Sequence, residues 1–439
     1  MDIIIGFILS FAVLLLGVLK GWYIGFLLVL CLIIFSIISL RRGNDSKDII
    51  YMAWDGGKKG LIVVKIFLLI GMVTAVWLTA GTVPAIVYYG MKLMNPRFYI
   101  LFAFLISSTV SYMLGTSFGT VSTVGIALMV MAKGGNINPN LAAGAIISGC
   151  YFGDRTSPMS SCANLVSNLT ETDLYPMLKK LLKTTILPFL IVGIAYLFLS
   201  FKNPLNIIGN EILSDISHTY TINIMVLLPA ILMLVLSILK VDVKLSMIIS
   251  IIIGIIVAKI VQQVPVVSLF KTIILGYNLE PSNPLVNIIK GGGMLSMMKA
   301  GFIVFISCAI AGVLNGIDLF NKVNDLFTKI NSKSGLFLVT GAVSLFTAAF
   351  GGNQSIAIVM TSEIMKMKYE KLEIDKYQLA SDIGNTAVIL SPLIPWNISN
   401  IIPTTTLNVS SLGFIPYAFY LYFPFIINYI YLRISERNS

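Results

Sequence analysis

Long apolar segments, separated by short polar loops, dominate the hydropathy pattern of this chain. Each of the longest segments approaches the roughly 20 residues that a helix needs to cross a bilayer. Clear examples are residues 2–19, 21–40, 184–201, 222–239 and 412–431. The pattern predicts an all-α polytopic membrane protein.

Over the whole chain, the same pattern predicts fourteen crossings. The stretch 98–132 allows a second interpretation, as one tilted helix instead of two crossings. The predicted crossings lie at about residues 2–19, 21–40, 60–80, 98–114, 115–132, 141–170, 184–201, 220–239, 243–262, 299–316, 334–350, 351–367, 379–409 and 412–431.

Composition agrees with this class. Hydrophobic residues make up 57% of the 439 residues and charged residues only 11%, against about 25% charged in a soluble domain. The formal charge of +11 would suggest a nucleic-acid partner in a soluble protein, but here the bases stand in short clusters between apolar segments. We therefore expect the lipid bilayer, and no nucleic acid, as a partner; a homodimer stays open.

The clusters of bases predict the orientation, because cytoplasmic loops of membrane proteins are enriched in Lys and Arg. With the N-terminus in the cytoplasm, 19 of the 30 bases fall in inside loops and 8 in outside loops. This asymmetry predicts a multi-pass protein of the cell membrane with both termini cytoplasmic. The inside loops are residues 41–59, 179–183, 240–244, 322–333, 366–376 and 433–437.

The two halves of the chain match weakly but in the same order. Ser117 corresponds to Ser355 and Thr123 to Thr361, and Ser157-Pro158 corresponds to Ser391-Pro392, all at shifts of 234–238 residues. The second copy starts seven crossings after the first, and an odd displacement implies opposite orientation. Inverted repeats with broken helices near the midplane are typical of secondary transporters. We predict four parts: an N-terminal pair of crossings with its loop (1–52), a first inverted repeat (53–201), linking helices (202–287) and a second inverted repeat (288–439).

The first polar break interrupts the predicted crossing 141–170. Asp154 and Arg155 lie inside it, and each costs about 2.5–3.5 kcal/mol on insertion scales, so such residues usually face a cavity or each other. Pro158 cannot continue the helix and frees the carbonyl of Asp154. Oxygen ligands beside a carboxylate suit Na⁺ or a proton relay. The alternative is that Asp154 and Arg155 simply pair at a helix end. The candidate ion-binding residues are Asp154, Thr156, Ser157, Ser160, Ser161 and Asn164, with Na⁺ at Asp154, Ser157 and Asn164.

A second break follows Asp382, the acid of the second half. Pro392 and Pro395 release the carbonyls of Val388 and Ser391. We expect Asp382 to be a second cation or proton site. Trp396 either closes a substrate pocket or anchors the chain at the interface. The candidate substrate-binding residues of this break are Asn385, Thr386, Ser391, Trp396 and Asn397.

Two stretches rich in glycine and small polar residues complete the candidate site. Such residues permit close helix packing, and broken helix ends can also bind a substrate. The candidates here are Ser117, Thr120, Asn353, Gln354 and Ser355. The four cysteines have no metal spacing and the chain has a single His. We therefore expect that the protein is not an enzyme and uses no cofactor. Na⁺ or H⁺ would be its coupling ion.

At these motifs the sequence resembles the NhaC family of Na⁺/H⁺ antiporters. The resemblance rests on residues 115–120, on Gly153-Asp154-Arg155 with Ser157-Pro158, and on residues 391–397. It implies a cation-coupled exchanger that works by alternating access. Members of this family exchange Na⁺ for protons, exchange malate for lactate, or carry amino acids.

The chain departs from the family pattern after Ser157-Pro158, where Ser161 stands in place of a carboxylate. Fewer titratable groups in the path favour a small organic substrate, an amino acid or a dicarboxylate, and Arg155 would then meet its carboxylate. Na⁺/H⁺ antiport and organic transport both stay open, and a passive channel is a remote alternative.

Overall fold

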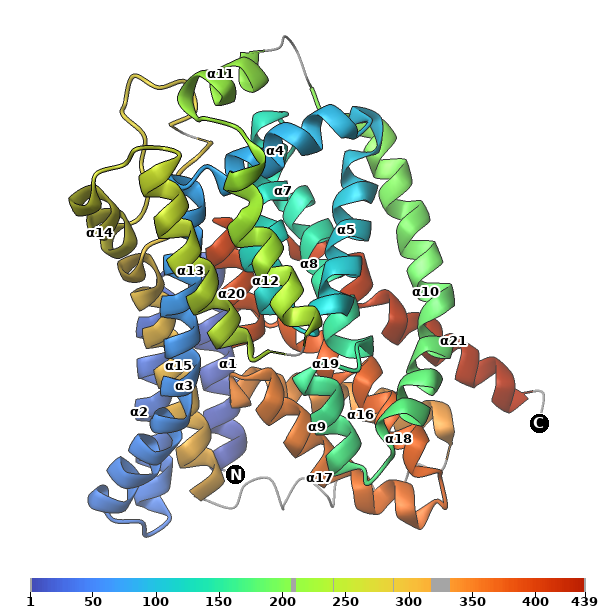
Figure 1. Ribbon diagram of the computed structural model, residues 1–439. Coiled ribbons are helices and arrows are strands. Elements are labelled where there is room, and N and C mark those ends of the chain that lie inside the picture. Colours follow the sequence, from blue (N-terminus) through green and yellow to red (C-terminus); the bar gives the residue numbers. More distant parts are fainter. Residues whose placement is uncertain (1, 207–210, 240, 287, 317–331, 438–439) are drawn as a thin grey trace.

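The computed structural model describes residues 2–206, 211–239, 241–286, 288–316 and 332–437, and this part of the chain is helical (Figure 1). Residues 322–331 of one predicted cytoplasmic loop lie outside it. The helices are α1 (Asp2–Leu19), α2 (Ile24–Arg41), α3 (Ser46–Thr79), α4 (Thr82–Leu93), α5 (Tyr99–Leu114), α6 (Ser117–Thr120), α7 (Ile126–Gly134), α8 (Pro139–Thr156), α9 (Ser161–Leu169), α10 (Leu174–Lys202), α11 (Glu211–Thr219), α12 (Leu228–Ile238), α13 (Val243–Ile260), α14 (Val266–Leu275), α15 (Met294–Gly316), α16 (Lys333–Gly351), α17 (Gln354–Lys371), α18 (Lys376–Asn385), α19 (Ala387–Leu390), α20 (Ile398–Leu407) and α21 (Phe423–Arg437).

Six of the described helices are long and apolar enough to cross a membrane, or up to eight if each of two bent pairs is one span. The fourteen predicted crossings exceed this number because several of them are built from short helices that meet at breaks. The stretch 98–132 forms separate helices, α5 and α7, on either side of the left-handed Gly115 (φ 66°). It is therefore not one tilted helix.

The predicted helix at 412–431 is wrong. The chain there forms two short 3-10 turns, Ile415–Tyr417 and Phe419–Leu421, and only then enters α21. Pro416 and Pro424 fit this difference, since each lies in the first turn of its helical segment, where its missing amide costs no hydrogen bond. Apolar length alone does not reveal such breaks.

Glycines bring helix backbones into direct contact at two places. A Cβ on Gly56 of α3 would lie 2.3 Å from the carbonyl oxygen of Cys308 on α15. A Cβ on Gly153 of α8 would lie 2.1 Å from the carbonyl carbon of Ser111 on α5, and one on Gly149, one turn earlier, would lie 2.5 Å from the carbonyl oxygen of Phe104. Small residues spaced four apart allow this approach in membrane helices. The α5–α8 contact fixes the helix that carries Asp154.

Several backbone features recur 237 residues apart. The C-cap glycines of α5 and α16 have φ angles of 66° and 62°, and the left-handed residues after α9 and α20 both have φ of 53°. In this register Pro158 corresponds to Pro395, so the predicted match with Pro392 is three residues out of step. The five pairs are Gly115 and Gly352, Asn136 and Glu373, the N-caps Asn138 and Asp375, the N-caps Ser160 and Asn397, and Glu171 and Asn408.

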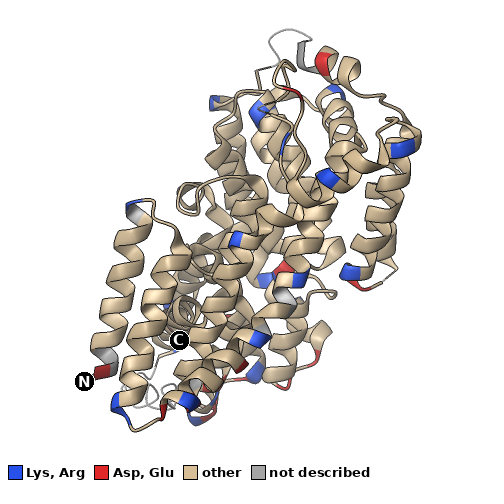
Figure 2. Ribbon diagram, turned by 90° about the vertical axis from the view of Figure 1, so that its left-hand side faces the viewer, with Lys and Arg blue, Asp and Glu red and all other residues tan. Residues whose placement is uncertain are grey.

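Figure 2 shows groups of charged residues at the upper and lower ends of the molecule and others at mid-height. At one end the loop after α9 meets the loop between α17 and α18. Lys366 pairs with Glu171 at 2.6 Å, and Lys180 pairs with Asp375 at 3.2 Å. The hydrogen bond and charge of Lys366 lower the pKa of Glu171, which favours the ionised carboxylate that the pair requires. Exposed pairs of this kind contribute little to stability, and the packed helices dominate.

The glycine contact gives a direct test. Gly153→Ala forces a methyl group into the backbone of α5, and overpacking of this kind costs about 1–3 kcal/mol. Gly193→Ala on α10 is the matched control, because a Cβ there meets no atom within 4 Å and alanine favours the helix. We expect a lower melting temperature in detergent for Gly153→Ala and an unchanged or higher one for Gly193→Ala. Equal melting temperatures would refute the close α5–α8 contact.

Candidate functional site

The break after α8 is closed by the side chain of Ser160. The helix ends at Thr156, and Ser157 is extended. Ser160 caps α9, since its hydroxyl oxygen accepts from the amides of Cys162 (3.1 Å) and Ala163 (3.2 Å). The same hydroxyl donates to the carbonyl oxygen of Asp154. The carbonyl that Pro158 was predicted to free therefore has a donor from across the break.

The carboxylate of Asp154 is buried, with 4% of the residue exposed. Ser117 donates to Oδ2 at 3.1 Å and Cys162 donates to the same oxygen at 3.8 Å. The Ser160 hydroxyl lies 3.4 Å from Oδ1 and directs its proton mainly to the backbone carbonyl of Asp154. Gln354 of α17 is also close enough to interact. In the described part of the chain no Lys or Arg lies within 4.0 Å of this carboxylate. It is a buried acid surrounded by neutral donors.

The other residues predicted around Asp154 point elsewhere. Ser161 is exposed. The hydroxyl of Thr156 donates to the carbonyl of Phe152 (2.7 Å), and that of Ser157 accepts from the amide of Met159 (3.1 Å). Asn164 donates to the carbonyls of Pro158 and Ser160. Cys162 was missed, although its place two residues after the cap Ser160 in the first turn of α9 puts it beside the break.

Gln354 connects the two breaks. Its Nε2 donates to the carbonyl of Val388 at 2.8 Å, which is the carbonyl that Pro392 was predicted to free. The carbonyl of Ser391, freed by Pro395, accepts instead from the amide of Ile394 (3.1 Å). Gln354 starts α17, whose cap Asn353 accepts from the amide of Ser355 (2.8 Å). Ser355 itself is exposed.

Arg155 does not pair with its neighbour Asp154. The guanidinium is 1% exposed and donates to the hydroxyls of Tyr420 (3.0 Å) and Thr184 (3.1 Å) and to Oδ1 of Asn385. No acid lies within 4.0 Å of it among the residues that the structure describes. The alternative of a simple Asp154–Arg155 pair at a helix end is therefore wrong.

Asp382 is a second buried acid, 3% exposed. Tyr369 donates to its Oδ2 and Gln378 to its Oδ1, both at 2.8 Å. Its backbone carbonyl accepts from Thr386 (2.7 Å). Asp382 also lines a cavity of about 440 Å³, so this acid is accessible through the cavity.

The remaining candidate residues of the second break hydrogen-bond to backbone carbonyls. Trp396 is buried and donates to the carbonyl of Ala349 (2.7 Å), and Asn397 donates to that of Ala348 (2.7 Å). Trp396 is therefore not an interfacial anchor. Ser391 donates to the carbonyl of Ala387 (2.5 Å) within its own helical turn. Thr120 likewise donates to the carbonyl of Thr116 (2.8 Å), beside the π-helical turn Val121–Gly125.

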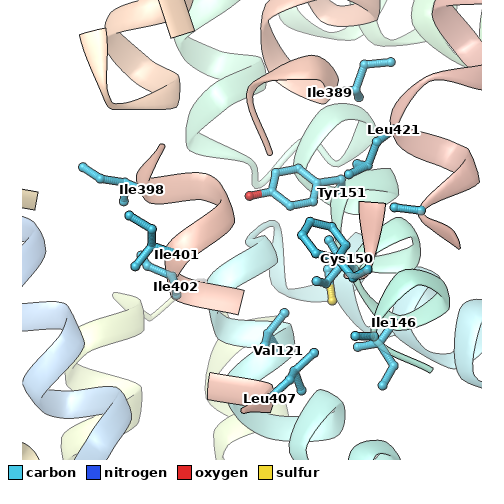
Figure 3. Packing of buried hydrophobic residues seen from close by; sticks show 14 of the residues in the cluster. Val121, Ile146, Cys150, Tyr151, Ile389, Ile398, Ile401, Ile402, Leu407 and Leu421 are labelled. Carbon is cyan, nitrogen blue, oxygen red and sulfur yellow. The ribbon is translucent and has the colours of Figure 1, made fainter. Parts of the chain in front are cut away.

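Tyr151 connects α8 to the helix that follows the second break. Its hydroxyl donates to the carbonyl of Ser399 on α20 at 2.6 Å. Figure 3 shows its ring between the α8 residues and the apolar side chains of Ile398, Ile401 and Ile402. One turn of α8 thus carries Tyr151, Asp154 and Arg155 to three different neighbours. The arrangement can hold a cation or a proton at either buried acid.

Comparison with known proteins agrees with this chemistry. Residues 149–434 match the Na⁺/H⁺ antiporter family. The Na⁺/H⁺ antiporter NhaC of Alkalihalophilus pseudofirmus is 30% identical, over 94% of this chain and 91% of that protein. The malate-2H⁺/Na⁺-lactate antiporter of Bacillus subtilis is 28% identical, over 95% and 89%. The arginine/ornithine antiporter ArcD of Halobacterium salinarum is 28% identical, over 82% and 76%.

The two adjacent serines of the first break allow a matched test. Ser160→Ala removes a helix cap, worth about 1 kcal/mol, together with the donor to Asp154. Ser161→Ala changes an exposed side chain. We expect a lower melting temperature for Ser160→Ala and little change for Ser161→Ala, measured on the purified proteins in detergent. The reverse order would contradict the observed direction of these side chains.

Proposed function

This chain belongs to the Na⁺/H⁺ antiporter family, and on that premise we propose that it exchanges Na⁺ for protons across the cell membrane by alternating access. Membership makes the protein a secondary transporter and not an enzyme, as the sequence motifs predicted. The observation that carries the proposal is Asp154, a buried carboxylate at a helix break with neutral donors only.

The cation site that we propose consists of Asp154 with the oxygens of Ser117, Ser160 and Gln354. Hard cations prefer oxygen ligands. A buried carboxylate without a positively charged partner is costly unless a cation or a proton neutralises it. Ser157 and Asn164 are not among the cation ligands that we propose, because their side chains hydrogen-bond to backbone groups. Ser161 and Thr156 face away.

We assign the second acid, Asp382, to the proton or to a second cation. Tyr369 and Gln378 hold one carboxylate oxygen each, and the adjoining cavity gives water or an ion access to it. Both acids lie in the last turn of a helix before a break, Asp154 in α8 and Asp382 in α18, and secondary transporters bind their ions at such interrupted helices.

We further propose that the paired backbone features belong to two inverted repeats. Matching caps 237 residues apart support two copies of one motif. The charge pattern supports opposite orientation, since the loop at 133–140 holds one base whereas its counterpart at 366–376 holds four. Positive loops face the cytoplasm. Rocking of such repeats against each other would give alternating access.

A second candidate function is exchange of a small organic substrate. Relatives are an antiporter of malate and lactate and an antiporter of arginine and ornithine. The observation that favours this candidate is Arg155, a buried cation without an acid partner in the described part of the chain. An anionic substrate would supply the missing charge.

Neutralising Asp154 tests the cation site. We expect Asp154→Asn to abolish Na⁺-driven proton exchange in proteoliposomes while the protein folds, because the amide keeps the shape of the side chain and loses the charge. Asp48→Asn is the control, since Asp48 is exposed at the start of α3 and its loss leaves exchange intact. Full exchange by Asp154→Asn would remove this residue from the mechanism.

Equivalent positions of the two repeats test the inversion. Pro139 and Lys376 are exposed first residues of α8 and α18. In a background without the native cysteines, a membrane-impermeant maleimide added to intact cells should label Pro139→Cys and spare Lys376→Cys until the cells are opened. Labelling of both from outside would contradict an inverted arrangement.

A further inference from the structure

Among the residues that the structure describes, only neutral groups hold Arg155, and one of its nitrogens has no hydrogen-bond partner. Nε makes no hydrogen bond, although the whole side chain is buried. The other two nitrogens have partners: Nη1 donates to the hydroxyl of Tyr420, and Nη2 donates to the hydroxyl of Thr184 and the amide oxygen of Asn385. A buried guanidinium without a counter-charge is strongly unfavourable. The fold therefore retains an uncompensated positive charge at a defined point.

Two of the three hydrogen-bond partners of Arg155 line the cavity beside Asp382. Thr184 of α10 and Asn385 of α18 both line this space of about 440 Å³, and Asn428 of α21 closes its third side. Small-molecule sites commonly have about 300–1,000 Å³. The cavity thus has room for a small organic molecule, and two of its lining residues, Thr184 and Asn385, hydrogen-bond directly to the guanidinium.

Pro188 shapes this wall. It removes the helical hydrogen bond to the carbonyl of Thr184, and Asn428 Nδ2 donates to that carbonyl at 3.2 Å. Asn428 also approaches Oδ1 of Asn385 at 3.4 Å. The polar groups of the three helices therefore meet at one point, directly in front of Arg155.

The charges around the cavity are mostly positive. Lys180 and Lys183 lie on the cavity face of α10, four and one residues before Thr184. Lys180 pairs with Asp375, whereas the exposed Lys183 has no acid within 4.0 Å among the described residues. Asp382 is the single acid of the lining. The lining offers cations to a carboxylate and one acid to a hydrogen-bond donor.

We propose that this cavity binds a small organic carboxylate that carries a second hydrogen-bond donor, a hydroxyl or an ammonium group. The bound carboxylate replaces the Asn385 oxygen on the Arg155 guanidinium, which can hold it through two hydrogen bonds. Lys183 at the mouth does not touch this carboxylate, and its positive charge favours the anion inside the cavity. The donor group of the ligand meets Asp382. The inference rests on the proposed transport function only in that the ligand is taken to be the organic substrate.

Thermal stabilisation of the purified protein at fixed Na⁺ concentration tests the site, since a ligand that binds the folded state raises its melting temperature. The probes are L-malate, L-lactate, ornithine and the neutral diamide succinamide. We expect stabilisation by at least one carboxylate and none by succinamide. Lys183→Gln should weaken apparent binding about tenfold, and Arg155→Lys more than that. Lys179→Gln, an exposed base outside the lining, should bind as the unchanged protein does.

Two results overturn the proposal: no carboxylate stabilises the protein, or stabilisation is the same in Lys183→Gln and in the unchanged protein. Lys183 is on the surface, so this variant decides the matter even if Arg155→Lys does not fold. Stabilisation by phosphatidylglycerol vesicles alone would also overturn it, in favour of a lipid site. Na⁺-driven proton exchange, measured on the same preparation, tests the proposed antiport separately from carboxylate binding.

Discussion

Inside a membrane every backbone polar group needs a partner within the protein, because the hydrocarbon offers none. In and near the prolines and breaks of its helices, this chain leaves carbonyls without a helical amide, and side chains donate to several of them. Ser160 donates to the carbonyl of Asp154, Gln354 to that of Val388, and Asn428 to that of Thr184. Asn400 donates to the carbonyl of Pro392 at 2.8 Å. The irregular centre of the fold is possible because of these four donors.

The same side chains build the candidate site. Ser160 and Gln354 satisfy freed carbonyls and lie beside Asp154, while Asn428 satisfies Thr184 and lies beside Asn385. Polar side chains are needed at the breaks for structural reasons, and a cation or a carboxylate can use the lone pairs and protons that remain. In the proposed site, structural and binding roles would therefore fall on the same residues.

Sequence reasoning predicted the breaks well and the side-chain directions poorly. Asp154, Pro158 and Pro392 are conspicuous in an apolar chain, and the release of the Val388 carbonyl follows from proline chemistry alone. The choice of Ser160 and Cys162 over Ser161 does not, because the phase of a helix after a break depends on the φ and ψ angles of the residues between. The contact of Trp396 with Ala349 joins residues far apart in the chain and leaves no local signal. The short turns at 415–421 were hidden by uniform hydropathy.

Asp154 and Arg155 are adjacent in sequence, and this adjacency has a mechanical consequence. Successive residues of an α-helix point about 100° apart, so the acid faces α6, α9 and α17 while the base faces α10, α18 and the turn that holds Tyr420. Both side chains extend from the last turn of α8. Another face of α8 packs closely against the backbone of α5 at Gly149 and Gly153. A movement of that turn relative to its neighbours cannot change the surroundings of one charge without changing those of the other. A cation at Asp154 and a carboxylate at Arg155 would thus be coupled through a single piece of backbone, with no need for direct contact between the two ligands.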